Sequence, residues 1–385
     1  MRFGLCRLSR HGHFLLYAPV GEGTCKMRKL ILALTLAMTM SSSVLAAWPM
    51  WDQFKAVGME GARVVDYSDA RAVTTSEGQS YAMFFALVDN DRETFEEMLK
   101  WTENNLSAGD ITKNFAAWLW GKDGSQWTIL DTNNAVDSDM WIAYCLLEAG
   151  RLWDRPDYTE KARAMLELLK TQVRDIDNLG KVLLPGRIGF EHDGQVKLNP
   201  SYYPLFLLKR FALEDQYWQD VFEGSARVLI RSAPAGISPD WATFSSRGEL
   251  VPVDSVDNTI GSYNSIRVYL WAGMMSPKDP VYRELKAHFE PMIKITRELN
   301  MPPEKIDVNT LQINQPGWDG FGACLLELLG QDKSADLIRT VLSSAPIEKE
   351  NYYRNVLTLF GLGFDQGYFA FDEDGRVYFP NQRKQ

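Results

Sequence analysis

Amphipathic helical segments follow one another along this chain from about residue 49 onward, and they constrain its fold more than any other feature. Apolar residues return every three or four positions, and loops rich in Gly, Pro, Asn and Asp separate the segments. Strand-like stretches are short, for example 182–184 and 376–379. The pattern predicts an all-α protein with twelve helices, at 49–56, 78–89, 92–106, 138–152, 157–174, 202–213, 216–232, 262–275, 280–298, 318–330, 333–343 and 350–361.

The spacing of these segments favours a closed ring of helical hairpins. Successive first members of a pair lie roughly 50–60 residues apart, which fits a helical hairpin plus a functional loop. Six such hairpins can close into a barrel in which inner helices pack on each other and the first helix pairs with the last. An open solenoid is the alternative, but no motif repeats at a fixed period. The variable loops hold the unusual residues, which predicts a site at one rim.

The first 46 residues are typical of a targeting segment. Met27-Arg28-Lys29 gives a positive start, 30–38 is a short apolar run, and Val44-Leu45-Ala46 offers small residues for a signal peptidase. The run is too short for a bilayer, which needs about 20 apolar residues. We expect translation to start at Met27, with 1–26 an upstream mis-start or extended leader. Cleavage after Ala46 would leave one catalytic domain, 47–385, in the periplasm or secreted.

The charge of the chain argues against nucleic acid as a partner. Removing residues 1–46 takes away six basic residues and one acidic residue, which lowers the formal charge from −9 to −14. Such a surface repels phosphate backbones but does not affect a neutral polysaccharide. No later segment is apolar enough to span a membrane, and no helix has a leftover apolar stripe, so we expect a monomer.

Few cysteines and histidines remain after residue 46. Cys145 and Cys324 lie in apolar helical patterns, which predicts buried free thiols, although a disulfide stays open as an alternative. His192 and His288 are far apart, which argues against a zinc site and against a Ser-His-Asp triad. We therefore expect no metal and no cofactor.

Two carboxylates stand at the starts of apolar helices among small polar residues. Glu77 lies within 74–81, and Asp137 begins Asp137-Ser138-Asp139 sixty residues later. Helix capping is the competing interpretation: Thr74 and Glu77 fit a capping box, and Asp137 and Asp139 fit N-terminal caps. In an aromatic-rich chain the pair also fits acid-base cleavage of a sugar polymer, since inverting glycosidases place two carboxyl groups about 6.5–9.5 Å apart.

Aromatic residues in predicted loops fit the walls of a sugar-binding cleft. Sugar rings stack their C–H faces on indole or phenol rings. By contrast, Trp141, Trp153 and Trp271 fall at helical spacing among apolar neighbours, and we assign them to packing. The candidates for substrate binding are Trp118, Trp120, Trp127, Tyr202, Tyr203 and Trp241.

Several motifs together make the chain similar to glycoside hydrolase family 8, and within it to the periplasmic endo-1,4-β-glucanases (cellulases) of bacterial cellulose-synthesis operons. The likeness runs from Trp48 to about Tyr378. It rests on Thr75-Ser76-Glu77-Gly78-Gln79-Ser80-Tyr81, Trp118-Leu119-Trp120-Gly121, Ala135-Val136-Asp137-Ser138-Asp139, 147–153, 184–186, 199–202, Ser238-Pro239-Asp240-Trp241 and Ser262-Tyr263-Asn264-Ser265-Ile266-Arg267-Val268.

The resemblance implies an (α/α)6 barrel that cleaves β-1,4-linked glycans with inversion. It makes Glu77 the general acid. Asp137 matches the signature aspartate, which we assign to sugar binding and transition-state support because inversion forms no covalent intermediate. Tyr263 and Arg267 are assigned to substrate binding. The implied partners are a β-1,4-glucan and the cellulose synthase machinery.

The chain departs from the family pattern at the expected general base. Val136 and Ser138 are mild changes, but Asn264 stands where the family has an Asp that activates water. A carboxamide does not accept a proton near neutral pH, and losing a general base costs about 10²–10⁴ in rate.

Several alternatives follow from Asn264. In the first, Asp257 or Asp254 in the preceding loop acts as the base while Asn264 holds the water. In the second, the enzyme is slow. In the third, the protein is a non-hydrolytic glycan-binding accessory. A chitosanase or xylanase of the same fold is a further alternative.

Overall fold

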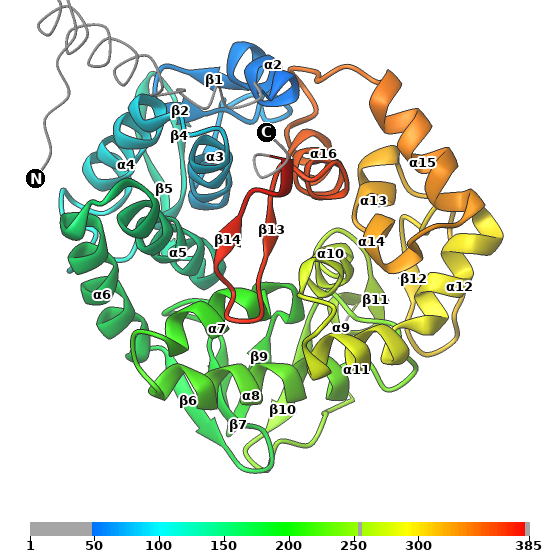
Figure 1. Cartoon of the computed structure of the whole chain (residues 1–385). Helices are drawn as coiled ribbons and strands as arrows, with labels where there is room; N and C mark the ends of the chain where they lie inside the picture. The colour runs from blue at the N-terminus through cyan, green and yellow to red at the C-terminus, as the bar shows by residue number, and fades with distance from the viewer. Residues whose placement is uncertain (1–47, 253–255, 382–385) are drawn as a thin grey trace, which may run out of the picture. The chain divides into compact units, whose positions relative to one another are not determined.

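The computed structural model describes residues 48–252 and 256–381. For residues 256 and 257 it describes the backbone only. The described residues belong to one compact unit. Its helices make a ring of antiparallel pairs with short strands in the connections (Figure 1). The predicted all-α class is therefore confirmed. No helix in the described part of the chain is both long and apolar enough to cross a membrane.

Each hairpin of the ring places one helix inside and one outside. The inner helices α3, α5, α7, α10, α13 with α14, and α16 face the centre of the ring (Figure 1). Contacts join α3 to α5, α5 to α7, and α16 back to α3, and α2 packs on α16, so the first helix does pair with the last. The helices are α2 (Pro49–Gly58), α3 (Ser76–Val88), α4 (Arg92–Leu106), α5 (Val136–Trp153), α6 (Pro156–Lys170), α7 (Leu205–Ala212), α8 (Tyr217–Arg231), α9 (Val256–Thr259), α10 (Ile266–Met274), α11 (Pro280–His288), α12 (Glu290–Leu299), α13 (Asp319–Ala323), α14 (Leu326–Leu329), α15 (Lys333–Ser344) and α16 (Tyr352–Asp365).

Hydrophobic patterning explains which helix is inside. A helix that is apolar on all sides must be buried on all sides, whereas an outer helix needs one apolar face. In α3 every residue except Glu77 is buried, while α4 buries only one face. The core is rich in aromatic contacts, and the predicted packing roles of Trp141, Trp153 and Trp271 are confirmed by exposures of 0%, 8% and 3%. Cys145 and Cys324 are buried and free, as predicted.

Some predicted helix boundaries are wrong, and proline accounts for two of the errors. The segment 280–298 is two helices, α11 and α12, because Pro291 lies in the first turn of α12 and has no N–H to continue α11. The segment 202–213 is α-helical only from Leu205, after a short 3-10 helix at Pro200–Tyr202, because Pro204 disfavours α-helical backbone before it. The segment 318–330 is likewise split, into α13 and α14.

Six small antiparallel sheets lie in the connections of the described chain, and most escaped the sequence prediction. Their order is β1-β2, β3-β4-β5, β6-β7, β8-β9-β10, β11-β12 and β13-β14. The strands are β1 (Met59–Glu60), β2 (Arg63–Val64), β3 (Thr74–Thr75), β4 (Ala117–Asp123), β5 (Gln126–Asn134), β6 (Val173–Ile176), β7 (Gly180–Leu183), β8 (Glu191–His192), β9 (Gln195–Leu198), β10 (Ala242–Ser245), β11 (Ile260–Gly261), β12 (Ile306–Asp307), β13 (Ala370–Phe371) and β14 (Val377–Tyr378).

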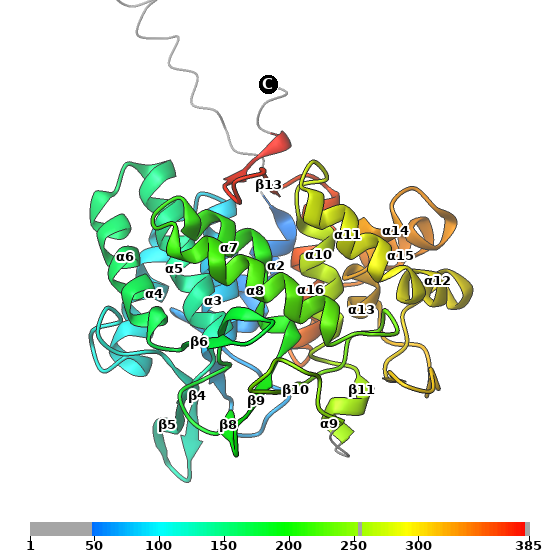
Figure 2. The ribbon, with the colours of Figure 1, turned by 90° about the horizontal axis from the view of Figure 1, so that it is seen from below.

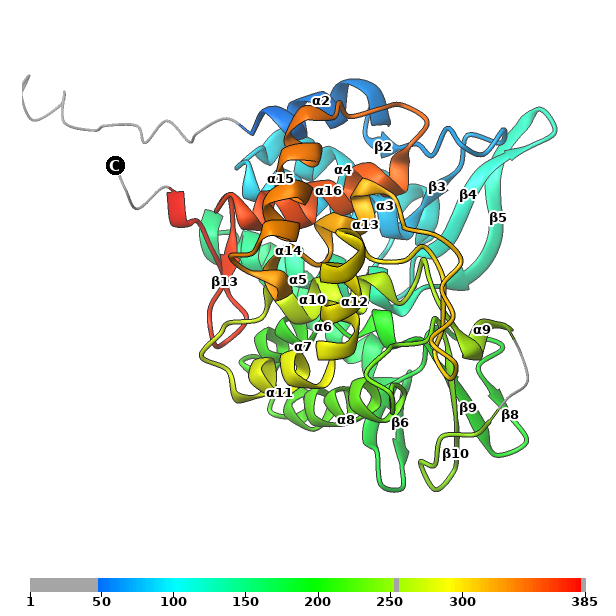
Figure 3. The ribbon, with the colours of Figure 1, turned by 90° about the vertical axis from the view of Figure 1, so that its right-hand side faces the viewer.

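The sheets divide between the two ends of the barrel. The β13–β14 hairpin covers one end, and β4–β5, β8–β10 and β11 extend from the other (Figures 2 and 3). The β13–β14 hairpin is fixed to α5, because the Tyr144 hydroxyl donates to the Gly375 carbonyl at 2.8 Å and Glu148 accepts the Val377 N–H at 3.0 Å. One end is thereby closed, which leaves the opposite rim for a ligand.

We expect Gly375→Ala to destabilise the protein more than Gly124→Ala. Both glycines have positive φ, at 76° and 60°, so both alanines carry the left-handed backbone cost of about 1 kcal/mol. A Cβ at Gly375 would lie 1.9 Å from the Phe206 carbonyl oxygen, whereas nothing lies within 4 Å at Gly124. Overpacking should add about 1–3 kcal/mol at Gly375 alone. Urea unfolding of both variants measures the difference in stability. Equal losses of unfolding free energy would contradict the close approach of Gly375 to the Phe206 carbonyl.

Candidate active site

Glu77 lies at the start of α3, and its carboxylate points away from the helix. The helix cap is Thr75, whose Oγ1 accepts the Gly78 N–H at 3.0 Å. Thr74 instead belongs to β3 and donates to the Val64 carbonyl at 2.6 Å. The capping-box alternative is therefore wrong. Glu77 pairs with Arg267 and accepts the Tyr352 hydroxyl at 3.0 Å, with its side chain 20% exposed.

Asp137 lies in the first turn of α5. Its Oδ1 accepts the Ser138 N–H at 2.8 Å, and its Oδ2 lies 3.4 Å from Arg267 Nη1. The residue at the cap is Ala135, so Asp137 is not the N-cap. Its side chain is 3% exposed. Burial raises the pKa of Asp137 to about 7, with Arg267 opposing that rise and Glu77 adding to it.

Arg267, from the first turn of α10, joins the two carboxylates. Its Nη1 contacts Glu77, Asp137 and, at 3.0 Å, the Tyr81 hydroxyl. Its guanidinium carbon lies 5.7 Å from the centre of the Tyr202 ring. The Arg267 side chain is only 4% exposed. It therefore positions the two carboxylates and offers little surface to a sugar. The structure thus brings Glu77, Asp137 and Arg267 into one cluster.

Asn264 completes the cluster, and its amide orientation is determined by its neighbours. Arg267 Nη2 donates to Asn264 Oδ1 at 3.0 Å, and Asn199 Nδ2 donates to the same atom at 3.1 Å. Arginine has no acceptor, and the Asn199 oxygen is already occupied by both the N–H and the hydroxyl of Ser201. The Asn264 oxygen must therefore face these donors, which leaves its NH₂ as the outward group. Asn264 presents a donor where a base would need an acceptor.

Asp240 holds the turn that carries Asn264, a role that the sequence reasoning missed. Its Oδ1 accepts the N–H groups of Ser262, Asn264 and Ser265 at 2.9, 3.0 and 2.8 Å, and its Oδ2 accepts the Ser262 hydroxyl. The residue is 9% exposed and its acceptors are occupied. Its position beside Trp241 in Ser238-Pro239-Asp240-Trp241 is the one signal for it in the sequence.

Tyr352 and Tyr353 were also missed. The Tyr352 hydroxyl donates to Glu77 across 275 residues of sequence, and the Tyr353 hydroxyl donates to the Tyr263 carbonyl. Both begin α16, the last inner helix, so ring closure delivers them to α3 and α10. The only sequence signal is a pair of tyrosines at a helix start.

The predicted aromatics divide into two groups. Trp118 and Trp120 lie on β4, not in a loop, and both are half-buried. Trp120 stacks on Trp127 with ring centres 4.8 Å apart, so each covers one face of the other, although Trp127 remains 43% exposed. In the second group, the Trp241 ring lies parallel to Phe190 at 5.8 Å and edge-on to Tyr202 at 6.2 Å. The second group reaches Arg267 through Tyr202, whereas the Trp120 and Trp127 rings contact Arg63, and Trp120 also contacts Trp101.

Other predicted site residues fall elsewhere. The prediction for Tyr203 is wrong, because its ring is 1% exposed and its hydroxyl donates to the Leu183 carbonyl at 2.7 Å inside the core. Tyr263 lies beside Asn264 and donates to Glu304 at 2.7 Å. Asp254 lies outside the described residues, and so does the side chain of Asp257.

Asp139 does not cap its helix but ties the two ends of the β4–β5 hairpin to α5. It accepts the Ala116 N–H at 3.1 Å and the Asn134 amide at 2.8 Å. Burial raises the pKa of Asp139 to about 7, above the value of about 3.9 in an unfolded chain. The folded state therefore favours the protonated form, and the resulting stability is complete below about pH 4 and lost as the pH rises through about 7.

We accordingly expect the stability advantage of wild type over Asp139→Asn to shrink between about pH 5 and about pH 8. The measurement is urea unfolding of both proteins at both pH values. Asp110→Asn is the control, because the pKa of Asp110 is lowered to about 2 by Lys113 and Thr112 and its charge does not change in this range. An advantage that grows with pH would contradict the assignment.

Comparison with known proteins identifies this arrangement. The model of the glycosyl hydrolases family 8 matches residues 25–367. The chain belongs to this family. It is 41% identical to an endoglucanase of Escherichia coli strain K12 over 91% of this chain and 96% of that protein, and 41% identical to an endoglucanase of Xanthomonas axonopodis over 86% and 88%.

Solved structures of the family agree with the fold. The crystal structure of an endo-1,4-D-glucanase from Vibrio fischeri superposes with a TM-score of 0.82 at 42% identity, covering 86% of this chain and 99% of that one. A family 8 endoglucanase from Klebsiella pneumoniae gives 0.70 at 25% identity over 83% and 99%. The predicted (α/α)6 barrel and the glycoside hydrolase assignment are thereby confirmed.

Proposed function

We propose that this protein is an inverting endo-1,4-β-glucanase that hydrolyses cellulose or a related β-1,4-glucan outside the cytoplasm. The single observation that carries the proposal is that two carboxylates, Glu77 and Asp137, pair with the same arginine. Of the two side chains, Glu77 is partly exposed to solvent and Asp137 is buried. The relatives that share most of the chain are named endoglucanases. The leader-like residues 1–46 support export, and a link to cellulose synthesis is part of the proposal.

In this mechanism Glu77 protonates the glycosidic oxygen, since its partly exposed carboxyl can contact a bound chain. Asp137, which shares Arg267 with Glu77, binds a hydroxyl of the distorted sugar and supports the positive charge of the transition state. The aromatic side chains that we assign to substrate binding stack on flanking sugar rings. Water attacks from the opposite face of the ring, which inverts the anomeric configuration.

The test is hydrolysis of soluble carboxymethylcellulose by the purified protein. A rapid fall in viscosity with few new reducing ends indicates internal cleavage, and proton NMR of cellopentaose digests shows whether the first product is the α-anomer. Retained β-configuration would refute inversion, and intact polymer would refute the glucanase proposal. Chitosan and xylan, assayed in parallel, test the alternative substrates.

The general base is proposed to come from Asp257 or Asp254, because the Asn264 oxygen is held by two donors and the acceptors of Asp240 are occupied. Asp254→Asn/Asp257→Asn should lower hydrolysis by about 10²–10⁴-fold. Adding Asn264→Asp to this double variant should raise its rate of hydrolysis at least about tenfold. One oxygen of the new carboxylate keeps the hydrogen bonds from Arg267 and Asn199, and the other can accept a proton from water. Full activity of the double variant would exclude both aspartates.

A further inference from the structure

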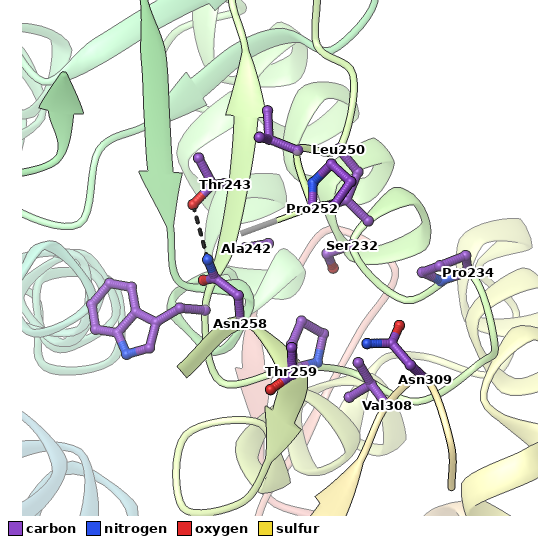
Figure 4. A pocket seen from close by; sticks show the side chains of 13 residues that line it. Ser232, Pro234, Ala242, Thr243, Leu250, Pro252, Asn258, Thr259, Val308 and Asn309 are labelled. Carbon is purple, nitrogen blue, oxygen red and sulfur yellow. Dashed lines mark hydrogen bonds between the residues drawn. The ribbon is translucent and has the colours of Figure 1, made fainter. Parts of the chain in front are cut away.

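The two ends of helix α3 lie in different surroundings. Its first turn carries Glu77 at the open rim, where β10 and α9 also border a cavity of about 410 Å³ whose lining includes the hydrogen-bonded pair Asn258 and Thr243 (Figure 4). Its other end is capped by Asp89, which contacts Trp48, the first residue that the structure describes. This second end of α3 therefore lies where the expected leader joins the catalytic domain.

Trp48 fixes the position at which the chain enters the domain. The residue is 1% exposed, and its ring stacks on Tyr368 at 5.1 Å and meets the edge of Phe85 on α3 at 5.6 Å. A Cβ added at Gly363 would lie 2.6 Å from the same ring, so the indole is also in close contact with α16. The backbone nitrogen of Trp48 is thereby held beside the end of α3, where it donates to Asp89 Oδ1 at 3.2 Å.

Asp89 is a half-buried carboxylate that has no ion pair within the described chain. The nearby Lys55 pairs instead with Asp91 at 2.8 Å and with Asp52 at 3.2 Å. Burial raises the pKa of Asp89 to about 6, against the lowering effects of the Trp48 N–H and Lys55. The carboxylates of Asp52 and Asp91 add to the rise. Asp89 also follows the last turn of α3, where the helix dipole disfavours a negative charge, so a cation would be stabilised here on both counts.

Removal of the leader would supply a cation at this place. Hydrolysis of the Ala46–Ala47 bond turns the nitrogen of Ala47 from an uncharged amide into an α-amino group, whose ordinary pKa is about 7.7–8.0. Three covalent bonds of about 1.3–1.5 Å separate this nitrogen from that of Trp48, so the two nitrogens lie within about 4 Å of each other in any backbone conformation. The new ammonium group is therefore within reach of the Asp89 carboxylate.

We propose that cleavage after Ala46 creates an α-ammonium group that forms an ion pair with Asp89 and thereby stabilises the processed catalytic domain. The inference rests on the proposed export, and it does not depend on which glycan is hydrolysed. In the unprocessed chain the nitrogen of Ala47 carries no charge, and the carboxylate of Asp89 stays without a cation. Processing thus acts on the far end of the helix whose first turn holds Glu77.

The experiment compares two forms of the protein by urea unfolding at about pH 7, where both the ammonium group and the carboxylate are charged. One form is the exported protein produced from the full chain, and mass spectrometry should show that it begins at Ala47. The other is a chain that begins at residue 43, in which residue 47 stays within a peptide bond. We expect Asp89→Asn to lower the folding equilibrium constant at least about fivefold more in the exported form than in the longer one.

Asp91→Asn is the matched control for this comparison. Asp91 lies two residues from Asp89 but already has Lys55 as its cation. Its substitution should therefore cost the two forms the same stability. A difference as large as that for Asp89→Asn would overturn the proposal, because the effect would then not be specific to Asp89.

The pKa of the α-amino group provides a second measurement, which does not depend on stability. A carboxylate nearby favours the charged amine, so the pKa of the α-amino group should be higher by at least about 0.5 in the exported wild type than in exported Asp89→Asn. Reductive methylation with 13C-labelled formaldehyde keeps the charge of the amine and allows its titration to be followed by NMR.

The outcomes separate this proposal from the proposed glucanase activity. Equal losses from Asp89→Asn in the two forms, or an α-amino pKa that Asp89→Asn leaves unchanged, would overturn the ion pair. An exported protein that begins at another residue would overturn the cleavage site and the inference with it. Hydrolysis of carboxymethylcellulose by the exported protein is a separate result, which fails only if the glucanase proposal fails.

Discussion

Glu77→Gln should lower hydrolysis of carboxymethylcellulose by about 10²–10⁴-fold while the protein stays folded. The amide has nearly the shape of the carboxyl but no acidic proton to transfer to the leaving oxygen. Its oxygen can face Arg267, and its NH₂ can donate to the Tyr352 hydroxyl, which is able to accept. The measurement is the initial rate of reducing-end release, with thermal unfolding as the check on folding.

Two comparisons show whether the loss reflects acid catalysis. Glu60→Gln is the matched control, because Glu60 also accepts from a tyrosine, Tyr67 at 2.8 Å, and from an arginine, Arg63 at 2.6 Å. Its activity should stay within about twofold of wild type, since no proton transfer depends on it. An aryl β-cellobioside with a strongly acidic leaving group needs no protonation, so Glu77→Gln should lose far less rate on it. Equal losses on both substrates would contradict the role of Glu77 as acid.

The helices were predictable because their signal is local. A period of 3.6 residues between breakers located most helices of the ring to within a few residues, and all-round apolar patterning in α3 and α5 marks inner helices. The β4–β5 hairpin was missed because its residues 122–128 are exposed and show no alternation. Other strands have only two to four residues, too few for a period to be seen.

The site was predictable only in part, because its parts meet through ring closure. Glu77 and Asp137 stood out at helix starts, but their common partner Arg267 lies 190 and 130 residues away from them in sequence. Tyr203 was misassigned because adjacent tyrosines at the end of a short turn point to opposite sides, Tyr202 toward Arg267 and Tyr203 into the core. Direction of this kind depends on the local backbone, which composition does not reveal.

Arg267→Met should be the most destabilising change in the site, at about 3–5 kcal/mol. The methionine fills much of the volume but leaves Asp137 buried without its cation, and Glu77, Tyr81 and Asn264 lose a donor. Arg297→Met is the matched control, because Arg297 also bonds two carboxylates, Asp332 at 2.8 Å and Glu290 at 2.9 Å. Its side chain is 41% exposed, so its loss should cost at most about 1 kcal/mol.

The cost of Arg267→Met should also depend on pH in a defined direction. Arg267 lowers the pKa of Asp137 against the larger effect of burial, so removing Arg267 raises that pKa above about 7. Asp137 then folds in its protonated form, and the variant loses stability over a wider range as the pH rises. Urea unfolding should therefore show a larger deficit at about pH 8 than at about pH 5. A deficit independent of pH would mean that lost packing, not an unpaired buried carboxylate, destabilises the variant, and Arg267 would then be a space-filling residue with no electrostatic hold on Asp137.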